Sequence, residues 1–389
     1  MSSHSPSSCS HSHASCSSTN PLRSLTKYGQ SIWLDFIRRG MFASGELARL
    51  IEEDGVSGMT SNPAIFEKAI NGSTDYDEAI RQLVLDGQDT NEIYETLVID
   101  DVRQAADWFA DVYARTEGRD GYVSLEVSPR LAHDEQPTID EAKRLWATVD
   151  RPNLMIKVPA TKAGLVATEE LITEGINVNM TLLFSLDRYR ESAEAYLAGL
   201  RRRAKQGGDV SRVASVASFF LSRIDTAVDP MLEQCVASGG SNAKTASELL
   251  GKVAVASGKV AYHMYGSLFA SETFADLAAL GAKTQRLLWA STSTKNAAYS
   301  DVMYVEPLIG PDTVNTLPVD ALNAYRDHGS PADRVEQEVA EARNVLQALP
   351  GLGIDLAAVT QQLEDEGIQK FIDPFDHLMA SLEKRRAAL

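Results

Sequence analysis

The chain has 389 residues, of which 44% are hydrophobic and 23% are charged, and its formal net charge is -17. This composition is typical of a globular protein, and the acidic excess argues against nucleic acid and membranes as partners. Three cysteines and no apolar stretch long enough to span a bilayer predict a cytoplasmic protein without a disulfide framework. Any anionic small ligand must therefore meet a locally cationic pocket.

Residues 1–22 differ in composition from the rest of the chain. Serine dominates this segment, and almost nothing apolar is present to bury, which predicts a disordered tail. The segment also holds the histidines and cysteines His4, Cys9, His11, His13 and Cys16. A metal site and a plastid transit peptide remain alternatives for this segment, although the spacing fits no closed metal site and a transit peptide would need more arginine. Residues 23–389 are predicted to form a single catalytic domain.

Eight short runs with the composition of strands alternate with helical stretches. In chain order the predicted strands are 31–36, 56–60, 122–128, 154–158, 178–184, 213–219, 286–290 and 302–308. The stretch 187–205 is typical of the helical parts, with apolar residues at helical spacing and Ser185 as its expected N-cap. Eight β units, each followed by a helix, predict an α/β fold of the (β/α)8 TIM barrel type rather than an open doubly wound sheet.

Two connections are much longer than the others. They run from about residue 63 to 120 and from about residue 221 to 285, and each has room for two or more helices. The segment from about residue 331 to the C-terminus is also helical in pattern. We therefore expect extra helices in the β2-β3 and β6-β7 connections and at the C-terminus, the last of them packed across the outside or the mouth of the barrel.

The fourth predicted strand carries a lysine inside an apolar run. Lys157 stands between Ile156 and Val158 in a segment that reads as buried on both faces, where an uncompensated ammonium is costly. Burial favours the neutral amine, and a neutral amine is a nucleophile for carbonyl carbon. From this segment alone, a structural lysine that reaches solvent or pairs with an acid remains the alternative.

Side-chain alternation along the strands places further polar residues on one face. In the third predicted strand Glu126 lies between Leu125 and Val127, and in the fifth Asn179 and Thr181 alternate with apolar residues. The apolar set should face the helices. The polar set predicted to point into the barrel is therefore Asp35, Glu126, Lys157, Asn179 and Thr181. Inward polar groups near the C-terminal ends of barrel strands are typical of a catalytic site.

Together these groups suggest Schiff-base chemistry on a sugar ketone. Lys157 would attack the carbonyl, and Glu126, through a water held by Thr181, would supply the proton with which the hydroxyl leaves. Asp35 is placed to take a proton as the neighbouring carbon-carbon bond breaks. This chemistry needs no cofactor and no metal, and the sequence has no motif for either.

Two later segments predict a phosphate site. The sixth strand ends near Ser218 and Arg223, and the seventh runs into Ser293 and Lys295. Hydroxyls, backbone amides and cations at the late strands of a barrel suit a phosphate group. Ion pairs with surface acids are the alternative for either cation taken alone.

These residues resemble the transaldolases, and the resemblance covers essentially the whole chain after the tail. It is carried by residues 33–35, 59–63, 124–127, 155–161, 175–185, 218–223 and 290–296. The resemblance implies that Lys157 is the Schiff-base lysine, that Glu126 and Thr181 hold the catalytic water, and that Asp35 handles the proton at the cleaved bond. The implied contacts with the substrate and its phosphate come from Thr60, Asn62, Asn179, Ser218, Phe220, Arg223, Ser293 and Lys295. Shorter relatives carry arginine where Lys295 aligns.

The reaction implied is reversible transfer of a dihydroxyacetone unit from sedoheptulose 7-phosphate to glyceraldehyde 3-phosphate. The products are erythrose 4-phosphate and fructose 6-phosphate, which places the enzyme in the pentose phosphate pathway with small sugar phosphates as its partners. The sequence leaves a monomer or a homodimer open.

Three other functions are alternatives to this one. The fructose 6-phosphate aldolases tend to carry glutamine and tyrosine where this chain has Glu126 and Phe220. A barrel glycoside hydrolase would use Asp35 and Glu126 as its two carboxylates but leaves Lys157 without a role. A non-catalytic sugar-phosphate binder would not need Lys157, Glu126 and Asp35 together.

Overall fold

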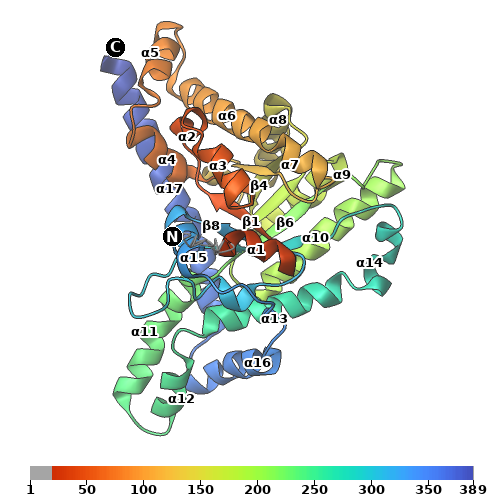
Figure 1. The fold of residues 1–389 in the computed structure, drawn as a ribbon, viewed down its shortest axis with the longest axis vertical. Helices are drawn as coiled ribbons and strands as arrows, with labels where there is room; N and C mark the ends of the chain where they lie inside the picture. Colours follow the sequence, from red (N-terminus) through yellow and green to blue (C-terminus); the bar gives the residue numbers. More distant parts are fainter. Residues whose placement is uncertain (1–19, 389) are drawn as a thin grey trace, which may run out of the picture.

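A closed barrel of parallel strands forms the centre of the computed structural model, which describes residues 20–388 (Figure 1). The strands are β1 (Gln30–Asp35), β2 (Val56–Thr60), β3 (Val123–Glu126), β4 (Leu154–Pro159), β5 (Val178–Leu183), β6 (Ser215–Phe220), β7 (Arg286–Ala290) and β8 (Thr313–Leu317). Each strand pairs with the next, and β8 pairs with β1 to close the ring. The predicted (β/α)8 TIM barrel is confirmed.

The eighth strand was predicted in the wrong place. Residues 302–308 form turns and a short 3-10 helix, η3 (Glu306–Leu308), and Pro307 in this run has no N–H to donate to a sheet. Their apolar side chains are buried in the core of the protein without joining the barrel. The true β8 is rich in Thr and Asn, so its composition resembles a loop, and only its pairing with β7 and β1 makes it a strand.

Helices surround the barrel as expected for alternating β and α units. Between the strands with short connections lie α2 (Arg39–Ala43), α3 (Glu46–Glu53), η2 (Pro129–Leu131), α8 (Glu135–Val149), α9 (Lys162–Glu174) and α10 (Leu186–Lys205). The expected N-cap is confirmed, since the Ser185 side chain accepts a hydrogen bond from the backbone N–H of Arg188. In the same way Thr161 caps α9 directly after β4. The two caps follow β4 and β5, where the chain leaves the barrel mouth and turns outward into a helix.

The extra helices occur where they were expected. The β2-β3 connection holds α4 (Pro63–Asn71), α5 (Asp77–Leu85), α6 (Thr90–Trp108) and α7 (Ala110–Arg115). The β6-β7 connection holds α11 (Ser222–Ser238), α12 (Asn242–Leu249), α13 (Val253–Leu268) and α14 (Ser271–Ala278). After β8 come α15 (Val319–His328), α16 (Val339–Ala348), η4 (Leu349–Leu352) and α17 (Leu356–Ala388).

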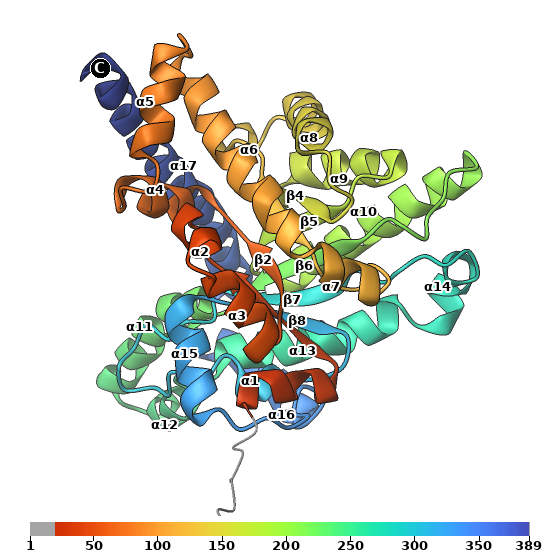
Figure 2. The same ribbon diagram turned by 45° about the horizontal axis from the view of Figure 1, so that its top comes forward.

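The long C-terminal helix α17 leans against the barrel mouth. It packs along α4 and α6, beside α5 at its far end, and it also contacts β5 and α11 (Figures 1 and 2). Its buried residues include Gly367 and Phe371, in the part that crosses the strand ends. The last helix of the chain therefore contributes to whatever site lies at this end of the barrel.

Only the end of the predicted N-terminal tail falls within the described residues. Residues 1–19 lie outside the described part, and with them the predicted tail and its metal-site and transit-peptide alternatives. Asn20 caps α1 (Pro21–Ser24), which η1 (Leu25–Tyr28) follows, and Leu22 is fully buried. The packed domain therefore begins before residue 23. Within residues 20–388, no helix combines the length and the apolar character needed to cross a membrane.

Candidate active site

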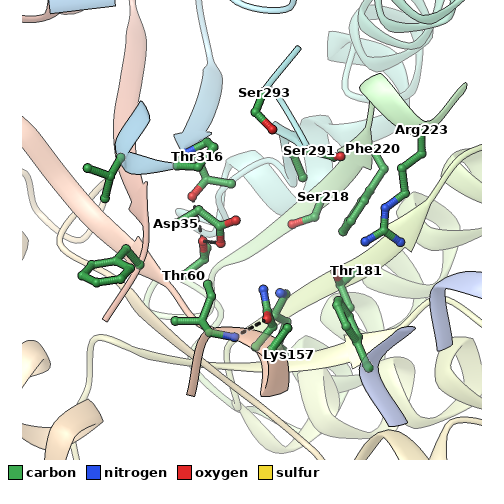
Figure 3. A pocket seen from close by; sticks show the side chains of 18 of the residues that line it. Asp35, Thr60, Lys157, Thr181, Ser218, Phe220, Arg223, Ser291, Ser293 and Thr316 are labelled. Atoms are coloured by element: carbon green, nitrogen blue, oxygen red, sulfur yellow. Dashed lines mark hydrogen bonds between the residues drawn. The ribbon is translucent and has the colours of Figure 1, made fainter. Parts of the chain in front are cut away.

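A pocket of about 440 Å³ opens at the C-terminal ends of the barrel strands (Figure 3). Most of the residues singled out from the sequence line it. They are Asp35, Thr60, Asn62, Lys157, Thr181, Ser218, Phe220, Arg223, Ser293 and Lys295. The strands deliver these side chains to one place because parallel barrel strands all end at the same face.

Lys157 lies on β4 at the base of this pocket. Its side chain is only 5% exposed, and its Nζ donates a hydrogen bond to the Ser61 carbonyl at 3.2 Å. The strand register places Glu126 of β3 directly beside it, and Glu126 Oε2 lies 3.4 Å from Nζ. The ring of Phe371 on α17 lies on another side, 5.6 Å from Nζ. Lys157 thus does not reach out to solvent but faces the pocket next to a buried acid.

Glu126 is a buried carboxyl with an unusual affinity for protons. Burial raises its pKa to about 7, although the positive charge of Lys157 acts in the opposite direction. Neither carboxyl oxygen has a hydrogen-bond partner among residues 20–388, and the same holds for the hydroxyl of Thr181. Glu126 does not line the main pocket itself. It stands behind Lys157, able to exchange protons near neutral pH.

Asp35 is the last residue of β1 and lines another side of the pocket. Its Oδ1 accepts a hydrogen bond of 2.6 Å from Thr60, whose hydroxyl is also 2.7 Å from that of Thr316. Burial raises the pKa of Asp35, against the opposing effects of Lys157, Thr60 and Arg223. Figure 3 shows Asp35 and Thr60 across the pocket from Arg223. This carboxyl is therefore placed to take up a proton from a ligand that extends between the two sides.

A backbone irregularity follows Thr181 in β5. Leu182 has a φ of 61°, and the pairing of β5 with β6 shifts register between Met180 and Leu183. A bulky residue at positive φ is strained, and bulges of this kind occur next to active sites, where they redirect side chains. Here the bulge separates Thr181, which lines the pocket, from Leu182, which is buried near Gly367 of α17.

Asn179 lies below the pocket floor rather than in its lining. It is fully buried, its Nδ2 donates to Ser124 Oγ at 3.0 Å, and its Oδ1 accepts from Ser218 Oγ at 2.6 Å. Asn62 lines the pocket and at the same time caps α4 through a hydrogen bond from the N–H of Ile65. Both amides are held in fixed orientations.

A cluster of cations lies at the rim. Arg223 packs over the Phe220 ring at 5.4 Å, and its Nη1 is buried without a hydrogen-bond partner in the described part of the chain. Lys295 donates to Ser293 Oγ at 2.6 Å. Burial lowers the pKa of Lys295, and the charges of Arg223 and Lys68 lower it further. The positive charges of Arg223, Lys68 and Lys295 repel one another here, and this arrangement can bind an anion.

Sequence reasoning missed several residues of the lining. Lys68 belongs to α4, where its charge is unremarkable in sequence, and Phe371 comes from a helix more than two hundred residues after Lys157. Thr316 was missed with the rest of β8. Ser291, at a φ of 53°, lies in a segment where the sequence pattern indicated hydroxyl groups without identifying this one. The alternation of Thr313 and Asn315 with Val314 was a weak signal for β8.

Comparison with known proteins adds a second line of observation. The family described as "Transaldolase/Fructose-6-phosphate aldolase" matches residues 32–382. The chain is 50% identical over 369 residues to "Transaldolase 2" of Nostoc sp. (strain PCC 7120), covering 94% of this chain and 97% of the relative. It is 48% identical to "Transaldolase" of Trichodesmium erythraeum (94% and 98% covered) and 47% identical to "Transaldolase" of Thiobacillus denitrificans (93% and 99% covered).

The chain belongs to the transaldolase/fructose-6-phosphate aldolase family. Within this family, relatives of nearly equal length that are named transaldolase support transaldolase function for it, as an enzyme of the transferase class. The family acts on sugar phosphates, and the pocket offers hydroxyl-binding and cationic groups together.

Proposed function

We propose that the protein transfers a dihydroxyacetone unit reversibly from sedoheptulose 7-phosphate to glyceraldehyde 3-phosphate through a Schiff base on Lys157. The observation that carries this proposal is the position of Lys157. Its amine is buried, faces the pocket, and lies 3.4 Å from Glu126, whose pKa of about 7 lets that carboxyl both accept and give a proton. A lysine kept for stability alone would need neither the cavity in front of it nor the poorly hydrogen-bonded acid beside it.

The first steps form the Schiff base. With Glu126 beside it to accept the ammonium proton, Lys157 attacks the ketone carbon and gives a carbinolamine. Glu126, with the Thr181 hydroxyl orienting a water, then returns a proton to the carbinolamine hydroxyl, which leaves as water. The buried side-chain oxygens of Glu126 and Thr181, which have no hydrogen-bond partner in the part of the chain that the structure describes, support these roles.

The next step breaks the carbon-carbon bond. Asp35 removes the proton of the adjacent hydroxyl, the bond cleaves, and the electron pair flows into the imine. The raised pKa of Asp35 suits a carboxyl that accepts a proton, and Thr60 and Thr316 hold it in place. The aldose product leaves, an acceptor aldehyde enters, and the reverse sequence completes the transfer.

The rest of the pocket binds the substrate. Asn62 and Ser218 face the sugar hydroxyls, with Asn179 fixing Ser218 from below. Phe220 supports Arg223, and the phosphate lies between Arg223, Lys295 and Ser293, where charge and hydroxyl donors converge.

A fructose 6-phosphate aldolase-like lyase is the second candidate, because the family includes both activities. Glu126 and Phe220 at their positions favour the transferase. Assays with and without an acceptor aldehyde separate the two: the transferase needs the acceptor for turnover, and the lyase does not.

Trapping the covalent intermediate tests the mechanism. Borohydride added with fructose 6-phosphate should reduce the Schiff base and leave a stable adduct on Lys157, found by mass spectrometry of the digested protein. The Lys157→Met variant should give no adduct and lose activity by at least about 10⁴-fold, since nucleophilic catalysis is removed. A wild-type enzyme without adduct, together with an active variant, would refute the proposal.

A further inference from the structure

A long loop after β7 carries part of the cationic rim. It spans residues 291–305 without a helix or strand, and its Ser291, Ser293 and Lys295 line the substrate pocket. Arg223 lines the same pocket from the first turn of α11. Loops of this length in compact domains are usually functional, and without regular structure they depend on specific side-chain contacts for their order. The contacts of the 291–305 loop therefore decide where Lys295 lies relative to Arg223.

Two tyrosine hydroxyls join the 291–305 loop to α11. Tyr299 donates to Asp229 Oδ2 at 2.8 Å, and Tyr304 donates to Asp225 Oδ2 at 3.0 Å. These two contacts are the Asp–Tyr pairs. Burial and the neighbouring carboxylate raise the pKa of both tyrosines, so their hydroxyls stay protonated and act as donors. Each pair therefore fixes one point of the loop on α11.

The carboxyl of each Asp–Tyr pair also binds the segment that starts α13. Asp225 Oδ1 accepts a hydrogen bond from the backbone N–H of Ala254 at 2.8 Å, and Asp229 Oδ1 accepts one from Gly251 at 2.9 Å. The two acids lie one turn apart on the same side of α11, whereas Arg223 lies on another side, because residues two apart in a helix do not face the same way. Each carboxyl therefore has one oxygen on α13 and the other on the loop, while Arg223 faces the pocket.

The backbone at Gly251 leaves room for the ring of Tyr299. Gly251 has a φ of 67°, in the left-handed region that favours glycine, and a Cβ there would lie only 2.9 Å from Tyr299 Cζ. The ring therefore packs directly on this backbone, and its hydroxyl reaches Asp229. This close packing fixes Tyr299 from a second side.

Stability alone does not explain the two acids. Asp225 is 1% exposed and Asp229 is 7% exposed, and neither forms an ion pair among residues 20–388. Burial raises the pKa of Asp225 to about 6, and the charge of Asp229 also raises it, against the hydrogen bonds from the α13 backbone and Tyr304. Buried like charges destabilise a fold, and groups with pKa values shifted in this way cluster at functional sites. The acids lie beside such a site, between α11 and the loop, both of which contribute to its lining.

We propose that the two Asp–Tyr pairs position the 291–305 loop for phosphate binding by holding Lys295 in the same pocket as Arg223, against the repulsion between these cations. The inference rests on the proposed function, in which the phosphate of a sugar phosphate binds at the cationic rim. Without phosphate, the charge of Arg223 disfavours that of Lys295, and a loop without regular structure would relieve this by moving away. A loop that is already held does not have to be ordered when phosphate binds, which strengthens binding. The two acids contact no substrate, so their role is to position.

Steady-state kinetics of Tyr299→Phe test the proposal. The substitution removes one hydroxyl and keeps the ring. We expect KM for fructose 6-phosphate to rise by roughly 3- to 10-fold, below the effect of losing a whole charge-assisted hydrogen bond, because Tyr304 still holds the loop. Trapping of unphosphorylated dihydroxyacetone on Lys157 should be unchanged. Tyr262→Phe, which removes a hydroxyl bonded to the Pro311 carbonyl away from the loop, is the matched control and should leave both values unchanged.

A double-mutant cycle shows whether Tyr299 acts through Lys295. Lys295→Ala should itself raise KM for fructose 6-phosphate, since it removes a cation from the rim. In that background Tyr299→Phe should lose most of its effect, because the group that Tyr299 positions is gone. An equal fold-change in both backgrounds would show a general structural effect and overturn the proposal, and so would a wild-type KM in Lys295→Ala.

Replacements of Asp229 separate its hydrogen bonds from its charge. Asp229→Asn keeps an oxygen for the Gly251 N–H and gains an amide that can donate to the Tyr299 hydroxyl, so KM should stay near the wild-type value. Asp229→Ala removes both contacts and should raise KM at least as much as Tyr299→Phe. A wild-type KM in Asp229→Ala would contradict the positioning role, and if this variant does not fold, Tyr299→Phe and the double-mutant cycle decide.

Borohydride trapping distinguishes this failure from failure of the proposed function. If dihydroxyacetone is trapped on Lys157 in the wild type while Tyr299→Phe has the wild-type KM, only the positioning role is wrong. If the wild type gives no adduct with dihydroxyacetone or fructose 6-phosphate, the Schiff-base function is wrong and the positioning role falls with it.

Discussion

At the scale of single residues, the acidic and the basic side chains of the pocket occupy different regions. The charge of Lys157 acts on the acids Asp35 and Glu126, whereas Arg223 and Lys295 lie at the rim. Arg223 is the better buried of the two cations, and its Nη1 has no hydrogen-bond partner among residues 20–388. In the proposed mechanism, reaction chemistry and phosphate binding therefore depend on different side chains, and we expect that each can be changed independently.

Replacing Arg223 should affect phosphorylated substrates selectively. A charge-assisted hydrogen bond contributes about 1.5–3 kcal/mol, so Arg223→Ala should raise KM for fructose 6-phosphate by roughly 10- to 100-fold. Trapping of unphosphorylated dihydroxyacetone on Lys157 should be nearly unchanged. Lys162→Ala, at an exposed position that starts α9 at the same end of the barrel, is the matched control and should leave both values alone. Equal losses on both substrates would argue against a phosphate contact.

At the scale of elements, α17 completes a site that the barrel alone leaves open. Phe371 forms a wall beside Lys157, and one turn earlier Gly367 lets the helix approach β5. A Cβ added at Gly367 would lie 3.0 Å from Leu182 Cδ2 and 3.6 Å from Arg223 Nη1. The absence of a side chain at Gly367 thus allows the contact between α17, the β5 bulge and the cationic rim.

Gly367→Val should push α17 away from the strand ends. Overpacking of this kind costs about 1–3 kcal/mol of unfolding free energy, and displacement of Arg223 should raise KM for fructose 6-phosphate several-fold. Gly266→Val is the matched control, because Gly266 lies near the end of α13 and an added Cβ there would meet nothing within 4 Å. Urea denaturation and steady-state kinetics of both variants decide the question. Similar effects at the two positions would contradict this role for Gly367.

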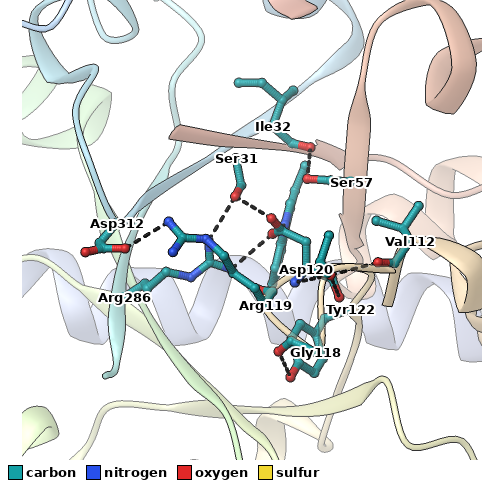
Figure 4. Close-up of polar contacts among 12 residues, drawn as sticks. Ser31, Ile32, Ser57, Val112, Gly118, Arg119, Asp120, Tyr122, Arg286 and Asp312 are labelled. Atoms are coloured by element: carbon teal, nitrogen blue, oxygen red, sulfur yellow. Dashed lines mark hydrogen bonds and ion pairs between the residues drawn. The ribbon is translucent and has the colours of Figure 1, made fainter. Parts of the chain in front are cut away.

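For the whole molecule, the end of the barrel opposite the pocket is closed by a buried ion pair (Figure 4). Arg286 at the start of β7 lies 3.0 Å from Asp120, which precedes β3, and Ser31 on β1 donates to Asp120 Oδ2 at 2.7 Å. Burial opposes ionisation of Asp120, but Arg286 and hydrogen bonds from Ser31 and Trp33 hold its pKa below the usual value. The cluster joins distant parts of the chain at the barrel floor.

Asp120→Asn should destabilise the fold and leave the active site intact. Leaving Arg286 unpaired costs roughly 3–5 kcal/mol at neutral pH. Because the folded-state pKa of Asp120 lies below the unfolded value of 3.8, this stabilisation is present above pH 3.8 and is lost as pH falls through the folded value. The difference from the wild type in urea denaturation should therefore shrink in acid, while kcat at 25 °C stays unchanged.

Asp312→Asn serves as its control. Asp312 pairs with Arg119 at 2.8 Å in the same region, but its side chain is 45% exposed, so the change should cost less than about 1 kcal/mol. If the two variants lost equal stability, the buried pair would have no special role at the barrel floor.

Seven of the barrel strands could be predicted because each is a local apolar run, and strand alternation identified the inward polar groups. The same reasoning failed for β8. Its Thr and Asn residues are buried by neighbouring strands rather than by their own hydrophobicity, and the apolar run at 302–308 packs in the core without pairing. Composition reports burial more directly than it reports strand pairing.

The sequence by itself determined the buried lysine, the acid beside it and the barrel, because these depend on patterns within a few residues: a lysine in an apolar strand, side chains alternating at period two, and helices between strands. Tertiary structure alone decided the placement of β8, the wall that Phe371 forms and the third cation, Lys68. Each of these depends on contacts between elements whose spacing along the chain carries no periodic signal. Packing of whole helices against the barrel brings such residues together.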